Sequence, residues 1–121
     1  MLYNNAIALC DTSRAVAEYI SQNKNVLHLY KSQRHCDIVL DAMLNDTVRI
    51  PFEINNAVHA NTIEDKQFSL RFIYIMTNNI LSYCRGLELE TMTNKEYIGV
   101  LKHEIKLFRK QYKKWRKSIS M

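Results

Sequence analysis

The sequence is poor in the residues that turn a polypeptide chain. It contains two glycines and one proline among 121 residues. Sheet proteins need such residues at many corners, whereas helical proteins need only a few breaks, so this scarcity favours an all-α fold. The length fits one domain, residues 1–121, and is sufficient to bury a hydrophobic core.

Long apolar runs are also missing. No stretch approaches the roughly 20 apolar residues that cross a membrane, and residues 1–10 lack the features of a signal peptide. We therefore expect a cytoplasmic protein with no membrane partner. The cysteines Cys10, Cys36 and Cys84 are far apart and form no C-x-x-C pair, which favours free buried thiols over disulfides or a zinc site.

Motifs of known active sites are absent from the sequence. It has no histidine pair at metal-ligand spacing, no glycine-rich nucleotide loop and no paired carboxylates. The adjacent residues His35, Cys36 and Asp37 would point to different sides of a helix and could not converge on one atom. We expect no catalytic residue, metal or cofactor. An enzyme would need a pocket that gathers His59 or His103 with a carboxylate.

Apolar residues recur at steps of three and four in four segments, which is the spacing of one helical face. We expect helices over about residues 2–22, 31–60, 63–88 and 94–118. Short connections make sequential helices antiparallel, so the sequence predicts an up-down-up-down four-helix bundle. The first helix carries the apolar stripe Leu2, Ala6, Leu9, Ser13, Val16 and Ile20.

Pro51 falls inside the second expected helix. Proline lacks an amide donor and clashes with the carbonyl four residues before it, so we expect a kink or break between Thr47 and Ile50. Thr62 should cap the third helix, with Asp65 three residues on. The third helix is apolar on two faces, which is typical of a helix between neighbours or in an oligomer interface.

The last expected helix begins at the capping box Thr93-Asn94-Lys95-Glu96. Its apolar residues form a sustained seam at heptad spacing, and the simplest interpretation is the core face of an antiparallel bundle. The seam consists of Tyr97, Leu101, Ile105, Phe108, Tyr112, Trp115 and Ile119.

Positive charge is concentrated at the C-terminal end. The net charge is +5, yet residues 102–121 hold eight of the 17 Lys and Arg and only one acid, Glu104. The rest of the chain is close to neutral. A basic stripe of this kind is expected for a polyanion partner. The eight bases lie off the apolar seam and are Lys102, Lys106, Arg109, Lys110, Lys113, Lys114, Arg116 and Lys117.

Three interpretations compete for this basic helix. Bases can complement the helix dipole, but that effect acts over the last turn, whereas these span about four turns. A membrane-surface helix would suit the aromatic seam, but the seam is needed to close the bundle. Phosphate binding explains why like charges are crowded despite their repulsion. We therefore favour RNA or DNA as the partner, with a protein-only adaptor for an acidic partner as the alternative.

Short motifs in the chain carry a family resemblance. Leu70-Arg71-Phe72 opens the third helix, Met92 to Tyr97 forms a hinge and helix start, and the chain closes on Trp115-Arg116-Lys117-Ser118. A weaker match is Tyr30-Lys31-Ser32. These motifs resemble the four-helix bundle family of the accessory variability determinant (Avd) of diversity-generating retroelements. Proteins encoded in intervening sequences of large-subunit ribosomal RNA genes belong to the same family.

The resemblance implies a pentameric ring of bundles with a basic surface. In that system Avd binds the reverse transcriptase and its template RNA, supports mutagenic complementary-DNA synthesis for retrohoming, and is not itself the catalyst. We therefore expect a non-enzymatic accessory protein that forms a homo-oligomer, a pentamer, and binds RNA or DNA together with a reverse transcriptase. The alternatives are a protein-only helical adaptor or a ribosomal RNA intervening-sequence protein of unknown role.

Overall fold

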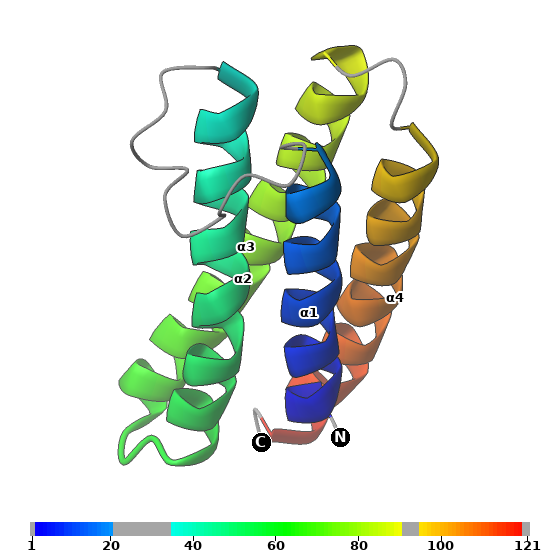
Figure 1. Cartoon of the computed structure of the whole chain (residues 1–121). Coiled ribbons are helices and arrows are strands. Elements are labelled where there is room, and N and C mark those ends of the chain that lie inside the picture. The colour runs from blue at the N-terminus through cyan, green and yellow to red at the C-terminus, as the bar shows by residue number, and fades with distance from the viewer. Residues whose placement is uncertain (1, 21–34, 91–94, 120–121) are drawn as a thin grey trace.

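A computed structural model describes residues 2–20, 35–90 and 95–119 of the chain. It contains the helices α1 (Leu2–Ile20), α2 (His35–Val58), α3 (Ile63–Glu90) and α4 (Lys95–Ile119). Successive helices run in opposite directions, as Figure 1 shows, and α4 packs back against α1. The helices therefore close a ring around one core, and the predicted all-α antiparallel four-helix bundle is confirmed.

Some sequence predictions fall on parts of the chain outside these described residues. They are the expected end of the first helix at residues 21–22, the expected start of the second at residues 31–34, and the Tyr30-Lys31-Ser32-Gln33-Arg34 match. The expected start of the fourth helix at residue 94, with the Thr93 side of the capping box, also lies outside them. Of the four described helices, none is long and apolar enough to cross a membrane.

The core is built from one apolar stripe on each helix. The predicted α1 stripe is buried from Leu2 to Ile20, and on α4 the seam residues Leu101, Ile105, Phe108 and Tyr112 are buried as expected. Burial of each such large side chain stabilises the fold by about 1.5–3 kcal/mol.

The start of the α4 seam differs from the prediction. Tyr97 is 44% exposed, and Ile98 is buried in its place. Ile98 lies three and seven residues before Leu101 and Ile105, so it shares their face of the helix. The ring of Tyr97 instead stacks on Tyr19 of α1, with 3.9 Å between ring centroids.

The start of α3 is fixed by two polar contacts. The Asp65 amide donates to Thr62 Oγ1 at 3.0 Å, which confirms Thr62 as the N-cap. One turn into the helix, Lys66 Nζ donates to the carbonyl oxygen of Ile119 at 3.3 Å. This cation lies at the negative end of the α4 dipole and ties the start of α3 to the end of α4.

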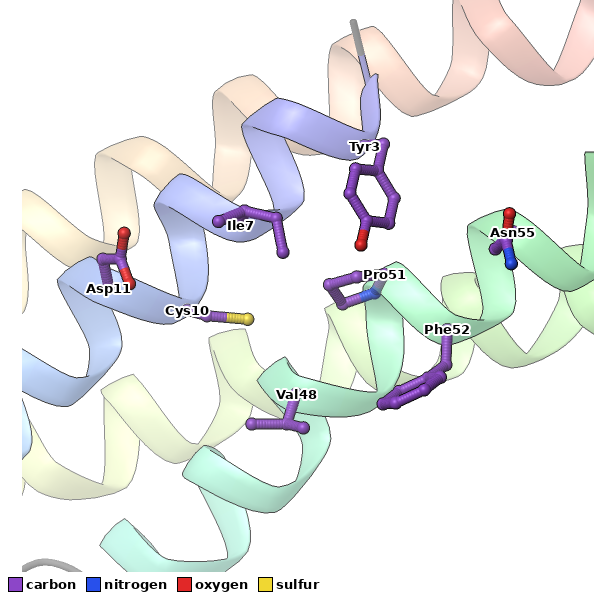
Figure 2. A pocket seen from close by; sticks show the side chains of 8 residues that line it. All are labelled: Tyr3, Ile7, Cys10, Asp11, Val48, Pro51, Phe52 and Asn55. Carbon is purple, nitrogen blue, oxygen red and sulfur yellow. The ribbon is translucent and has the colours of Figure 1, made fainter.

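Pro51 does not interrupt α2, which is helical from His35 to Val58. Proline deprives the carbonyl of Thr47, four residues earlier, of its usual amide donor. The Cys10 thiol on α1 donates to that carbonyl, with 2.9 Å between Sγ and O. Figure 2 shows the Cys10 sulfur directed from α1 toward α2 beside Val48 and Pro51. Of the expected kink or break, the break is absent. The donor that the neighbouring helix supplies would account for the unbroken helix.

This explanation can be tested by a double-mutant cycle. Cys10→Ala should leave the buried Thr47 carbonyl without a donor and lower the free energy of unfolding by about 1–3 kcal/mol. Cys10→Ser keeps a donor and should lower the free energy of unfolding by less. In a Pro51→Ala background the new backbone amide can donate to the Thr47 carbonyl. The loss of unfolding free energy caused by Cys10→Ala should therefore be at least about 0.5 kcal/mol smaller there. Urea unfolding followed by circular dichroism measures each value, and strictly additive losses would contradict the explanation.

Candidate nucleic-acid interface

The eight bases predicted to bind nucleic acid all lie on α4, away from its buried stripe. Because the apolar seam fixes the rotation of the helix, these side chains point to solvent or toward α3. Lys102 and Arg109 are half-buried. The six exposed bases are Lys106, Lys110, Lys113, Lys114, Arg116 and Lys117.

Lys102 differs from the others because it is already paired. Its Nζ lies 2.8 Å from Glu88 Oε1 on α3, and the two side chains are only 25% and 29% exposed. Partial burial weakens screening by water and strengthens their attraction. A phosphate would have to compete with Glu88 for Lys102. Across the ranges the structure describes, none of the other seven bases forms an ion pair.

Tyr112 joins α4 to α3 where the two helices meet. The Tyr112 ring is buried, and its hydroxyl donates to the carbonyl oxygen of Leu70 on α3. The Arg116 guanidinium lies near the Tyr112 side chain. Burial raises the pKa of Tyr112, Arg116 opposes that rise, and the nearby Tyr74 raises it further. Tyr74, Tyr112 and Arg116 are therefore neighbours across the two helices.

Two bases on α3 extend this surface. Arg71 and Arg85 are exposed, one turn before and about three turns after Tyr74, so all three share one side of α3. Leu70, one turn before Tyr74, accepts the hydrogen bond from Tyr112, so that side adjoins α4. We call this surface, made of the exposed bases of α4 with Arg71 and Arg85, the basic face. Sequence reasoning missed the α3 bases because they are scattered along the chain, and only their helical spacing could have indicated them.

Among the described residues, the cysteine and histidine side chains show no arrangement typical of a nucleophile or a metal site. Burial, together with the nearby Glu88 carboxylate, raises the pKa of Cys84 to about 12, so its thiol is protonated and unreactive at neutral pH. Burial also raises the pKa of Cys10. His103 is exposed on α4. Among the described residues no group of three or more His, Cys, Asp or Glu side chains could hold a metal ion.

One surface hollow does gather a histidine with carboxylates. It has a volume of about 340 Å³ at the turn between α2 and α3, and His59, Glu53 and Asp65 line it. His59 Nδ1 lies 3.0 Å from the Asn55 carbonyl oxygen, and Glu53 Oε1 accepts a hydrogen bond from Asn56. His59 and Asp65 are exposed, so water reaches and screens their charges. The hollow lacks the apolar enclosure that is usual around reacting groups.

A second hollow, shown in Figure 2, is an apolar groove between α1 and α2. Its volume is about 400 Å³. Phe52 is 67% exposed and Val48 52% exposed, and such a gathering of exposed apolar side chains often marks an interaction site. In the ring of helices, the α1–α2 side lies across from the α3–α4 side. The groove is lined by Tyr3, Ile7, Cys10, Asp11, Val48, Pro51, Phe52 and Asn55.

Comparison with known proteins gives no match: no protein-family model matches the chain, and neither curated proteins nor solved structures match it.

The Tyr112 contact predicts a measurable stability difference. Tyr112→Phe keeps the buried ring but removes the hydroxyl that donates to the Leu70 carbonyl, so the free energy of unfolding should fall by about 1 kcal/mol. Tyr3→Phe is the matched control, because Tyr3 is 47% exposed and its change should stay within about 0.5 kcal/mol. Thermal and urea unfolding provide the measurement. Equal stability of the two variants would mean that the hydroxyl does not hold the junction.

Proposed function

We propose that this protein is a non-catalytic accessory factor that binds nucleic acid through the basic face, in the manner of the accessory variability determinant of diversity-generating retroelements. The observation that carries the proposal is the one-sided charge of α4. Seven of its bases lie on the side away from the core, and none of them forms an ion pair with any described residue. Charge of this kind attracts phosphate and gives binding that depends strongly on salt.

The energetics of α4 support a polyanion partner. Lys106 and Lys110, Lys110 and Lys114, and Lys113 and Lys117 are spaced four residues apart. Each like-charged pair at this spacing destabilises a helix by about 0.2–0.5 kcal/mol. A phosphate backbone would replace this repulsion by attraction over about three helical turns.

The family resemblance supplies the remaining partners. Its clearest motifs, Leu70-Arg71-Phe72 and Trp115-Arg116-Lys117-Ser118, lie on the two helices that form the basic face. We therefore propose template RNA or complementary DNA as the bound nucleic acid, and a reverse transcriptase as the protein partner. The same resemblance leads us to propose a cytoplasmic homo-oligomer, a pentamer, that supports mutagenic retrohoming.

We assign the contact between copies to the apolar groove of α1 and α2. Each copy has a net charge of +5, so copies repel least when their basic faces point away from the contact. A closed ring needs two different complementary surfaces on each copy. The groove is one of these surfaces, and we take the exposed apolar side chains of Phe68 and Ile75 on α3 as the other. This arrangement uses the second apolar face of the third helix and leaves the basic face open to nucleic acid.

Charge removal tests nucleic-acid binding. Replacing Lys110, Lys113, Lys114 and Lys117 with glutamine should weaken RNA binding at least about tenfold at low salt and reduce the salt slope by up to about four. The loss should be similar for RNAs of unrelated sequence, since phosphates carry no sequence information. Fluorescence anisotropy over a range of salt concentrations measures both effects.

Two single-charge variants are compared: Lys114→Gln on the basic face and Arg14→Gln as its control. Arg14 is exposed on α1 and lies 3.7 Å from Glu18, outside the basic face, so its loss should leave RNA affinity unchanged within about twofold. If the wild-type protein binds neither RNA nor DNA at low ionic strength, the proposal is wrong and the adaptor for an acidic protein takes its place.

The subunit contact is tested by light scattering coupled to gel filtration. Phe52→Ser and Val48→Ser should convert the homo-oligomer to monomer while changing monomer stability by no more than about 0.5 kcal/mol, since both side chains are exposed. Val100→Ser, 60% exposed on α4, is the control and should leave the assembly intact. A monomeric wild-type protein would contradict the oligomer, and an unchanged oligomer in both groove variants would exclude the groove as its contact.

A further inference from the structure

An exposed aromatic ring lies within the basic face. Tyr74 is 42% exposed on α3, on the side that adjoins α4. In the described part of the chain no other ring and no cation stacks on it, whereas Tyr19 and Tyr97 stack on each other and Arg49 covers Phe72 at 5.2 Å. The ring of Tyr74 is therefore free to receive a ligand.

Cations flank the ring on both helices. Arg71 lies one turn before Tyr74 on α3. Across the junction, the Tyr112 hydroxyl contacts Leu70, one turn before Tyr74, and Arg116 lies one turn after Tyr112 on α4. Aromatic rings set between backbone-binding cations are the usual composition of sites for single-stranded nucleic acid, because every base has a face that can stack. An exposed ring without cations on both sides would not have this composition.

We infer that the basic face binds a single strand, with an unpaired base stacked on Tyr74 and phosphates held by Arg71 and Arg116. The inference rests on the proposed nucleic-acid function and specifies its ligand. In a duplex the bases are stacked inside the helix, so a ring on a convex helical surface reaches only sugars and phosphates. Tyr74 can therefore contribute to single-strand binding and contributes nothing to duplex binding.

Two acids limit the extent of this site along α3. Glu64 lies two turns before Arg71 on the same side of the helix and is exposed, so it repels phosphate at the start of α3. Glu88, near the other end, is engaged with Lys102. The strand is thus directed across α3 onto the exposed bases of α4 rather than along the whole of α3.

The test compares a 20-nucleotide RNA without self-complementarity with the 20-base-pair RNA duplex of the same sequence. Fluorescence anisotropy of the full-length protein measures both affinities at several salt concentrations. Tyr74→Ala should weaken single-strand binding about tenfold, within the range of stacking on an aromatic side chain, and leave duplex binding unchanged within about twofold. The salt slope should not change, because no charge is removed.

Two further variants separate stacking from general damage. Tyr74→Phe keeps the stacking ring and should bind the single strand as wild type does. Val58→Ala truncates an apolar side chain that is 55% exposed on α2, outside both the basic face and the groove, and should have no effect on either RNA. In parallel, a single strand carrying 5-iodouridine should form a photo-crosslink to Tyr74 that mass spectrometry can map.

The outcomes distinguish the stacking site at Tyr74 from the nucleic-acid binding on which it rests. A tenfold loss for the single strand alone, restored in Tyr74→Phe, and a crosslink to Tyr74 support the stacking site. Single-strand binding that is indifferent to Tyr74→Ala overturns the stacking site but leaves the nucleic-acid function standing, and so does an equal loss for the duplex. A wild-type protein that binds neither RNA overturns both.

Discussion

Burial of one side of α4 against α1 and α3 closes the ring of helices, and the rest of the surface follows from it. Leu101, Ile105 and Phe108 exclude water from that contact, and their spacing fixes the rotation of the helix. Once the rotation is fixed, the bases between them can point only outward or toward α3. The position of the basic face is thus a product of core packing, and no contact made by the bases themselves is needed to set it.

The side chains at the junction of α3 and α4 connect packing to charge. Tyr112 is part of the core, yet its hydroxyl donates to the Leu70 carbonyl, and the Arg116 guanidinium lies near it. Across the ring, Phe52 and Val48 lie in the apolar groove, far from this charge. The groove and the basic face therefore lie on separate sides of one small domain.

Periodicity in the sequence was sufficient to predict the fold class and most of the core. Stripes such as Leu2 to Ile20 depend on local spacing, and the Thr62 cap depends on three neighbouring residues, so both could be read from a short stretch of chain. The continuity of α2 through Pro51 could not, because its explanation is a thiol 41 residues away on another helix. Tertiary contacts between α1 and α4 likewise place Tyr97 on the surface.

The predicted binding residues were located on α4 as expected, but their setting required the structure. Lys102 is paired with Glu88 of α3, which no local pattern indicates. Arg71 and Tyr74 were not predicted from the sequence to bind nucleic acid, and they join the basic face only because α3 packs beside α4. A surface that combines two helices is assembled by packing. The pattern along one helix therefore predicts only the residues that this helix contributes.

The helix that completes the bundle also carries most of its unbalanced charge, and this ties folding to the ionic surroundings. Repulsion along α4 acts against the same helix whose burial closes the core, and it is largest where few counterions are present. Any polyanion that binds the native surface and not the unfolded chain shifts the folding equilibrium toward the native state by mass action. A polyanion on the basic face of this protein would therefore also stabilise its bundle.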